Sequence, residues 1–460
     1  MSRGAMPWPH RSDHTAIWTL AWPMIVANVS VPLLGLVDAA ILGHLPDARY
    51  LAAVAVATAL FSFLYWGFGF LRMGTTGLIA QRYGSEPDGD AARLGRDTGL
   101  RMLTAQAVLL ALVISMLVLV ATPWLFPIGL ELMAPPPEVA AEAQTYWRIR
   151  MWSAPAVLVT YALTGMLVGM QDTRSVLAIT VSTNLVNIGL DLLLVLGFGM
   201  RTEGVAGATV AAEWLGCAIA LRCALTRLAA HPAPLDLVAL RSLARYRELF
   251  AVNGHLFVRT LTLIGTLAFF TAQGARQGEI VLAANALLMN LLMVVSYGLD
   301  GFAHAAEALT GRRFGAGDRS AFARAVMASA LFSLATAVAF TLVFLAVGES
   351  MIAVLTDIAE VRALAREFLP WLAFLPLIAV WCYLLDGVFI GVTATRDMRD
   401  TMLASTLLVF LPLWWLTRDL GNTGLWLALN AFFAARGISL GVRYLQGMAN
   451  ARWFPDPPEQ

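Results

Sequence analysis

The sequence contains no lysine, and all 31 of its basic side chains are arginines among 460 residues. Without lysine the chain has neither a Schiff-base amine nor the lysine of a phosphate-binding Walker loop, so these two kinds of chemistry are excluded. Charged residues make up only 13% of the chain, against about 25% in soluble domains. The net charge of +1 provides no basic field of the kind that attracts nucleic acid.

Cysteine is also scarce. The three cysteines, Cys217, Cys223 and Cys382, lie in apolar segments and do not have the spacing of metal ligands. We therefore expect neither a disulfide framework nor a metal site built on cysteine. We also expect no cofactor other than a coupling ion, H⁺ or Na⁺.

Long hydrophobic runs are what the chain has in abundance, since 59% of its residues are hydrophobic. A membrane-spanning helix needs about 20 mostly apolar residues. The first run is too long for a signal peptide, and we interpret it as a retained first span. The sequence predicts an all-α polytopic membrane protein with twelve transmembrane helices, at residues 16–42, 51–80, 100–122, 148–170, 176–199, 204–226, 249–274, 280–310, 324–347, 369–394, 401–417 and 424–445.

Arginines are distributed unevenly between the loops. One alternate set of loops is rich in arginine, for example Arg82, Arg93, Arg96 and Arg101, whereas the opposite set holds few. The positive-inside rule therefore places the rich set and both termini in the cytoplasm. The Pro-rich stretch 121–144 is expected to be an outer loop.

Two stretches of the first half recur in the second half. "LAAVA" at 51 matches "LAANA" at 282, and "RYG" at 82–84 matches "RFG" at 313–315 at the same spacing. "GMLVGMQDTR" at 165–174 matches "GVFIGVTATR" at 387–396. These matches predict two six-helix bundles related by pseudo-two-fold symmetry along the membrane normal. The predicted organisation is an N-lobe at 1–226, a cytoplasmic linker at 227–248 and a C-lobe at 249–460.

A few ionisable residues lie within the predicted spans of the first half. Asp38 and Asp191 fall in the outer halves of spans 1 and 5, where a carboxylate is costly and usually functional. Asn187 shares a helix face with Asp191, and Thr209 of span 6 lies at similar depth. The four oxygen-bearing groups predict either a Na⁺ site or two carboxyl groups that share a proton. For Asn187 and Thr209, hydrogen bonding between helices is the alternative.

The second half has a different set of polar residues. At the repeat spacing Asn187 corresponds to Val409 and Asp191 to Leu413, so the pair is missing there. Instead, the inner halves of its spans carry five ionisable groups: Arg259, Asp300, His304, Glu307 and Asp386. Two interpretations remain open, a structural polar network or inner gate with Arg259 neutralising an acid, and a second coupling or substrate site.

The stretches "VDAAILGHL", "YGLDGFAHAAEALTGRRFGA" and "DGVFIGVTATRDMR" resemble the multidrug and toxic compound extrusion (MATE) family, above all its DinF-like bacterial branch. The resemblance implies an antiporter that expels organic, often cationic amphipathic compounds in exchange for H⁺ or Na⁺. It places the coupling site at Asp38, Asn187, Asp191 and Thr209, and a hinge at Pro23. The other major branch uses acids in spans 7 and 10, whereas span 7 here carries Arg259.

We expect a monomeric multi-pass protein of the bacterial inner membrane that is not an enzyme. Its partners are the lipid bilayer and a small-molecule substrate, with no nucleic acid. Protons are favoured over Na⁺ because desolvation and mutual repulsion both favour a protonated carboxyl group. The alternatives are a flippase for lipid-linked precursors and a membrane-embedded transferase that would use Asp300, His304 and Glu307.

Overall fold

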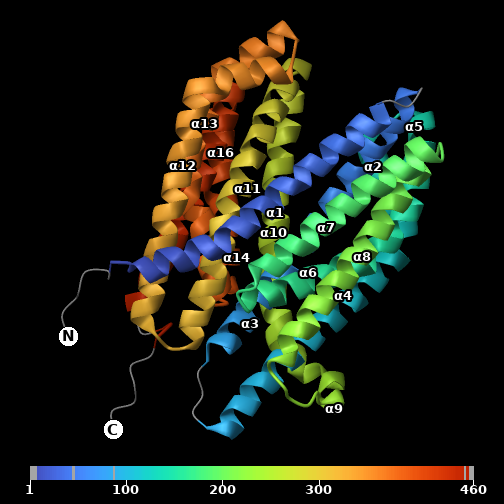
Figure 1. Cartoon of the computed structure of the whole chain (residues 1–460). Helices are drawn as coiled ribbons and strands as arrows, with labels where there is room; N and C mark the ends of the chain where they lie inside the picture. The colour runs from blue at the N-terminus through green and yellow to red at the C-terminus, as the bar shows by residue number, and fades with distance from the viewer. Residues whose placement is uncertain (1–7, 44–46, 86–88, 450–451, 455–460) are drawn as a thin grey trace. The chain divides into compact units, whose positions relative to one another are not determined.

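The computed structural model describes residues 8–43, 47–85, 89–449 and 452–454 (Figure 1). Every regular element in this described part is a helix. Within these described residues, twelve helical segments are long and apolar enough to cross a membrane, as the hydrophobic runs predict.

The chain divides into two compact units, each considered by itself. Unit 1 joins the chain up to Ile25 to the chain from Ala251 on, and unit 2 takes in Val26–Phe250. The first helix therefore contributes to both units. From the N-terminus to the linker the elements are α1 (Arg11–Gly43), α2 (Ala48–Gly67), α3 (Phe70–Gly84), α4 (Asp90–Met133), α5 (Pro137–Arg150), η1 (Met151–Ser153), α6 (Ala154–Gly169), α7 (Thr173–Asp191), the π-helical η2 (Leu192–Gly197), α8 (Thr202–Ala229), α9 (Leu237–Arg241) and η3 (Leu243–Tyr246).

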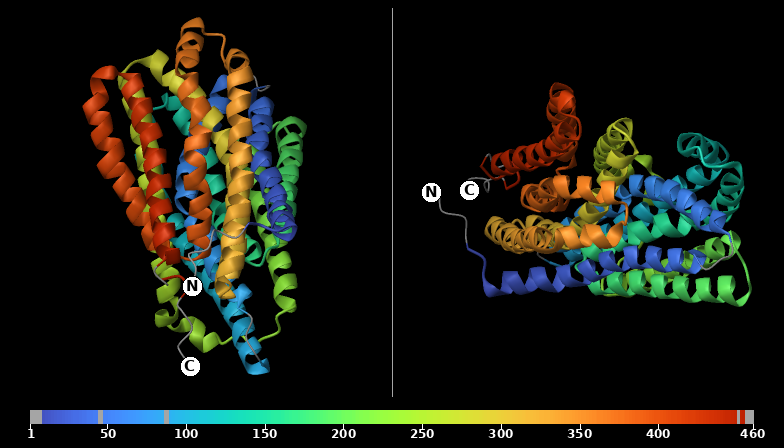
Figure 2. Two further views of the ribbon diagram at one scale, coloured as in Figure 1. Left: turned by 90° about the vertical axis from the view of Figure 1, so that its left-hand side faces the viewer. Right: turned by 90° about the horizontal axis from the view of Figure 1, so that it is seen from above.

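The second half is built from fewer and longer helices. They are α10 (Arg247–Arg276), α11 (Glu279–Gly315), α12 (Arg319–Leu355), α13 (Ala359–Gly391), α14 (Thr395–Ala404), the π-helical η4 (Ser405–Phe410), α15 (Leu411–Thr417), η5 (Arg418–Leu420) and α16 (Asn422–Ala449). Within unit 1, α13 packs against α11, α12 and α16 (Figure 2). Its buried apolar side chains, such as Leu372, Leu375 and Ala379, form the core of this unit.

The predicted outer loop at 121–144 is wrong. Helix α4 continues through Pro123 and Pro127 to Met133, and α5 begins at Pro137. Proline has a suitable φ for the first turn of a helix. Prolines inside a membrane helix are tolerated because neighbouring groups satisfy the freed backbone carbonyls.

The internal repeat is visible in the helix boundaries. The pair α2–α3 and helix α11 begin at Ala48 and Glu279 and end at Gly84 and Gly315, both 231 positions apart. Helices α8 and α16 begin and end 220 positions apart. The two halves differ at Phe68–Gly69, where α2 ends and α3 begins while α11 stays continuous. Two glycines flank Phe68, and such glycine pairs are a usual cause of a helix break.

The turns that follow α6 and α13 share an unusual backbone conformation. Gln171 and Thr393 both have a positive φ, 63° and 54°. They occupy corresponding positions of the matched stretches "GMLVGMQDTR" and "GVFIGVTATR". Because this conformation is rare for side chains other than glycine, its recurrence supports a common origin for the two turns.

The chain after α16 folds back onto unit 1. Trp453 and Phe454 are buried, with ring centroids 5.3 Å from Phe389 and 5.4 Å from Phe314, respectively. The adjacent Arg452 forms an ion pair with Asp397 at 3.0 Å. This segment therefore ties together the ends of α11, α13 and α14.

Candidate functional site

The predicted polar group of the first half is brought together in unit 2. Asp191 ends α7 and is followed by the π-helical turn η2, a distortion that is frequent at functional sites. The side-chain amide of Asn187 is oriented so that both its nitrogen and its oxygen have hydrogen-bond partners. In this orientation the nitrogen donates to Oδ2 of Asp191 at 3.1 Å. The amide oxygen then accepts from the backbone nitrogen of Thr209, also at 3.1 Å. Asp191 and Asn187 are fully buried.

Asp38 completes this group from α1. Its carboxyl group is in hydrogen-bonding contact with that of Asp191. In the described part of the chain, Oδ1 of each aspartate is buried without a hydrogen-bond partner. Buried acceptors normally have a partner, so both oxygens are available to a proton or a small cation.

An ion pair near the two aspartates has no counterpart in the sequence-based prediction. Nη2 of Arg150, at the end of α5, lies 3.1 Å from Oε1 of Glu213 on α8, and its guanidinium lies over the ring of Phe61. The positive charge of Arg150 also acts on Asp38 and Asp191. Both residues fall within predicted spans, as Asp38 does, although Arg148 and Arg222 lie in the same two spans.

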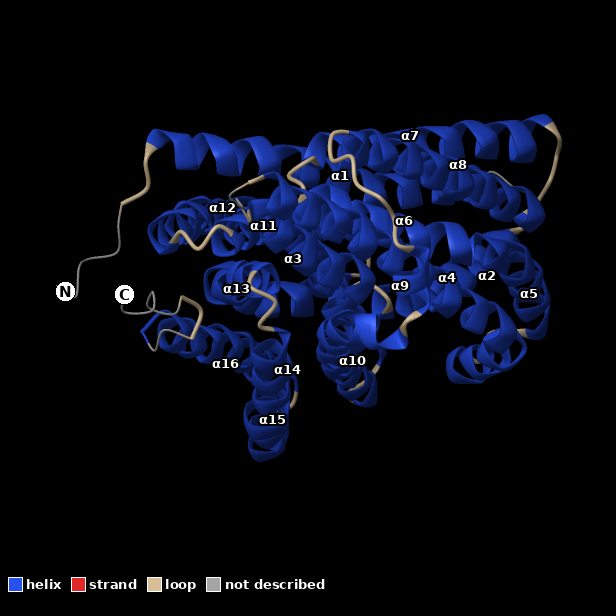
Figure 3. Cartoon of the chain, turned by 90° about the horizontal axis from the view of Figure 1, so that it is seen from below, coloured by secondary structure: helices blue, strands red, loops and turns tan. Residues whose placement is uncertain are grey.

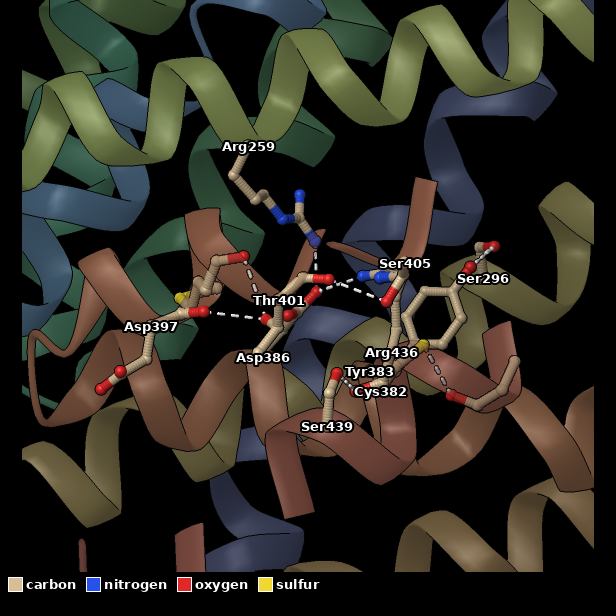
Figure 4. Close-up of polar contacts among 12 residues, drawn as sticks. Arg259, Ser296, Cys382, Tyr383, Asp386, Asp397, Thr401, Ser405, Arg436 and Ser439 are labelled. Carbon is tan, nitrogen blue, oxygen red and sulfur yellow. Dashed lines mark hydrogen bonds and ion pairs between the residues drawn. The ribbon is translucent and has the colours of Figure 1, made fainter. Parts of the chain in front are cut away.

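The second half holds a buried cluster of charges in unit 1. Asp386 on α13 accepts hydrogen bonds from Arg259 on α10 and, at 2.8 Å, from Arg436 on α16 (Figure 4). The two arginines are only 7% and 4% exposed. The guanidinium of Arg436 also lies over the ring of Phe432. Arg259 contacts Asp386, one of the acids that the sequence places beside it. Arg436 is not among the predicted site residues, although it is a charged residue near the middle of the twelfth predicted span.

The remaining predicted residues of this half lie along α11. Nδ1 of His304 is 3.6 Å from Oε2 of the buried Glu307. Asp300 acts electrostatically on Cys382 and Tyr383 of α13. Tyr383 in turn is hydrogen-bonded to Ser296 at 2.5 Å (Figure 4). The hydrogen bond between Ser296 and Tyr383 links α11 to α13.

The predicted hinge residue, Pro23, lies within the continuous helix α1 and is buried. Two residues further on, Ile25 packs against Gly301 of α11: a β-carbon built on that glycine would meet the Ile25 side chain at 2.2 Å. Pro23 thus adjoins a close helix–helix contact inside unit 1.

An apolar pocket of about 450 Å³ lies between α13 and α16. Its walls include Trp371, Phe374 and Leu427, and Asn430 contributes a polar side chain to the lining. This volume falls within the range of small-molecule pockets, about 300–1,000 Å³.

The family assignment follows from comparison with known proteins. The MatE family model matches residues 23–193 and 257–416, one block in each half. The chain belongs to the MatE family. DNA damage-inducible protein F of Escherichia coli strain K12 is 39% identical to this MatE chain, covering 96% of it and 94% of that protein.

Further relatives and a solved structure agree with this assignment. The probable multidrug resistance protein NorM of Xanthomonas campestris is 26% identical, with 93% of each chain covered. The bent form of the Vibrio cholerae MATE transporter VcmN has a TM-score of 0.84 at 19% identity, covering 96% of this chain and 99% of that one. The MatE chain is thus a multi-pass membrane transporter with the twelve-helix fold of this family.

Proposed function

We propose that this transporter is a secondary active antiporter that expels organic, often cationic amphipathic compounds in exchange for protons. The observation that carries the proposal is the contact between Asp38 and Asp191. Two carboxyl groups in hydrogen-bonding contact need a proton between them, since two adjacent anions repel each other. Asn187 donates to Asp191 and, with Thr209, fixes the orientation of the pair.

The exchange cycle follows from this chemistry. Protons that enter from outside neutralise the pair, which removes the negative charge that attracts a cationic substrate, and so favours substrate release. Loss of the protons to the cytoplasm restores the charge, and the substrate binds again. A Na⁺ ion held by the same oxygens is the competing form of the proposal, because Asp38, Asp191, Asn187 and Thr209 all offer oxygen ligands.

The roles of the other predicted residues complete the proposal. Pro23, which lacks a backbone donor, allows α1 to bend as the carboxyl pair changes charge. Coupling is confined to the N-lobe, while Arg259, Asp300, His304, Glu307 and Asp386 form a structural network. The chain works as a monomer in the bacterial inner membrane, with both termini in the cytoplasm and without enzymatic turnover.

The test is transport by purified protein in sealed proteoliposomes, with a pH gradient or a Na⁺ gradient imposed alone. We expect uphill transport of a cationic dye on the pH gradient, and its loss in Asp38→Asn, which keeps the shape of the side chain but cannot titrate. Asp90→Asn, an exposed position in the first turn of α4, is the control and should transport normally. Uphill transport by Asp38→Asn would refute the proposed site, and transport driven only by Na⁺ would replace the proton by Na⁺.

A further inference from the structure

The linker between α8 and α10 is an ordered segment, anchored to unit 2 on one face. Asp236 caps α9 by accepting from the backbone nitrogens of Val238 and Ala239, both at 3.0 Å. The hydroxyl of Tyr246 donates to the backbone oxygen of Leu240 at 2.9 Å. Ala239 and Tyr246 are buried, and α9 lies against α4 (Figure 3).

The opposite face of the linker is apolar and uncovered in this structure. Leu237, Val238 and Leu243 are 66%, 81% and 73% exposed. These three side chains belong to a segment whose other face is anchored to unit 2. Their exposure is therefore a feature of an ordered segment. An ordered segment that holds large apolar side chains away from the protein is typical of contact with the edge of a bilayer.

Basic residues accompany these apolar side chains. Arg241, Arg245 and Arg247 are exposed, and Nε2 of Gln106 donates to the backbone oxygen of Arg245 at 3.4 Å. Asp236 is the one acidic residue of 235–247 against these three arginines, so the net charge of the segment is positive. Positive charge beside apolar side chains complements the phosphates and acyl chains of an anionic lipid surface.

The chain itself holds the linker near the membrane. One candidate membrane span, Thr202–Ala229, ends just before the linker, and the next, Leu243–Arg276, begins within it. Only Ser242 lies between the end of α9 and the start of the following candidate span, so α9 stays close to that span. It lies on the arginine-rich side of the protein, where anionic headgroups attract basic segments.

We infer that residues 235–247 form a docking surface for anionic phospholipid, with Leu237, Val238 and Leu243 inserted among the acyl chains and the three arginines on the phosphates. This surface does not depend on which ion drives transport. Its partner is the lipid of the surrounding bilayer.

Depth measurement by electron paramagnetic resonance tests the docking. A spin label is attached at Val238→Cys in a variant whose three native cysteines are replaced by alanine. The protein is placed in nanodiscs of phosphatidylcholine alone or of an equimolar mixture with phosphatidylglycerol. We expect the label to collide with oxygen more than with a water-soluble nickel complex, and to lie deeper in the mixture. Asp357→Cys, in the exposed loop between α12 and α13, is the control and should remain in water.

A second measurement needs no cysteine. The melting temperature of the native-sequence protein should be higher in the phosphatidylglycerol mixture, and this gain should disappear in Arg241→Gln/Arg245→Gln/Arg247→Gln. Arg276→Gln, exposed at the opposite end of α10, should keep the gain. A label at residue 238 that is as accessible to nickel as the label at residue 357, or a gain that the triple variant retains, would overturn the inference.

Discussion

Gly387 on α13 lies against Ala303 on α11 so closely that a β-carbon built on the glycine would stand 2.3 Å from the backbone oxygen of Ala303. The first half repeats this contact, where a β-carbon on Gly165 would stand 2.4 Å from the backbone oxygen of Arg72. The two glycines are equivalent in one matched stretch, and Arg72 and Ala303 in the other. Each half is therefore held by the same close approach of two helix backbones, which requires a residue without a side chain.

Substitution of these glycines should destabilise the protein. We expect Gly387→Ala and Gly165→Ala each to lose about 1–3 kcal/mol, because the methyl group forces two backbones apart. The control is Gly207→Ala on α8, where the added carbon meets open space. Alanine also has a higher helix propensity than glycine, so this variant should not be destabilised. Thermal unfolding in detergent measures all three, and equal melting temperatures for Gly165→Ala and Gly207→Ala would contradict the expectation.

Removal of the charge at Glu213 should alter the pH dependence of transport. Glu213→Gln leaves Arg150 without its carboxylate partner, so the arginine interacts more strongly with Asp38 and Asp191 and favours their ionised forms. The pH of half-maximal proton-driven transport should then fall, by about one unit for each 1.4 kcal/mol of added interaction. Glu203→Gln, an exposed position in the first turn of α8, should leave the profile in place. A shift to higher pH would refute this role of Arg150.

The arginine cluster of unit 1 should matter for stability more than for coupling. Asp386→Asn removes the carboxylate that faces Arg259 and Arg436, and an uncompensated buried charge costs about 3–5 kcal/mol. Replacement of all three residues by apolar side chains of similar size should recover most of this loss. The ion-to-substrate ratio of the folded Asp386→Asn protein should equal that of the native sequence, and a changed ratio would show that this cluster takes part in coupling.

Acid should weaken the junction between α6 and α7. Burial alone would raise the pKa of Asp172, but hydrogen bonds from Arg227 and Ser175 outweigh burial and hold this pKa below its usual range. The pKa of an aspartate in the unfolded chain is near 4. Because the pKa of Asp172 in the folded protein is lower, its ionised form stabilises the fold at pH values above the unfolded-state pKa. This stabilisation is lost as the pH falls through the folded-state pKa.

Asp172→Asn keeps a helix-capping side chain but cannot titrate. It should be about 1.5–3 kcal/mol less stable at neutral pH, as expected for a lost charged hydrogen bond. Its stability should also change less between pH 5 and pH 2 than that of the native sequence. Urea unfolding at several pH values measures both effects, and an unchanged acid dependence would exclude Asp172 as a cause.

Sequence patterns predict those parts of the protein that repeat or alternate along the chain. The twelve spans follow from hydropathy, and the repeat follows from fixed spacings that the helix boundaries share. The grouping of Asn187 with Asp191 follows from helical periodicity, although their role in coupling stays a prediction. The contact between Arg150 and Glu213 could not be predicted in this way, because no periodicity in the sequence indicates that α5 packs against α8. The sequence does not predict the helix through Pro123, because proline interrupts helices in water but not always in a membrane.

The division of the chain into units has a consequence for the order in which the protein is made. Unit 2 is complete once Phe250 has been synthesised, so its packing can form while the second half is still on the ribosome. Unit 1 takes its parts from both ends of the chain. Helix α1 up to Ile25 must wait for α11, and the bundle closes only when Trp453 and Phe454 reach their aromatic partners. Premature termination before Trp453 would therefore spare unit 2 and leave unit 1 unfinished.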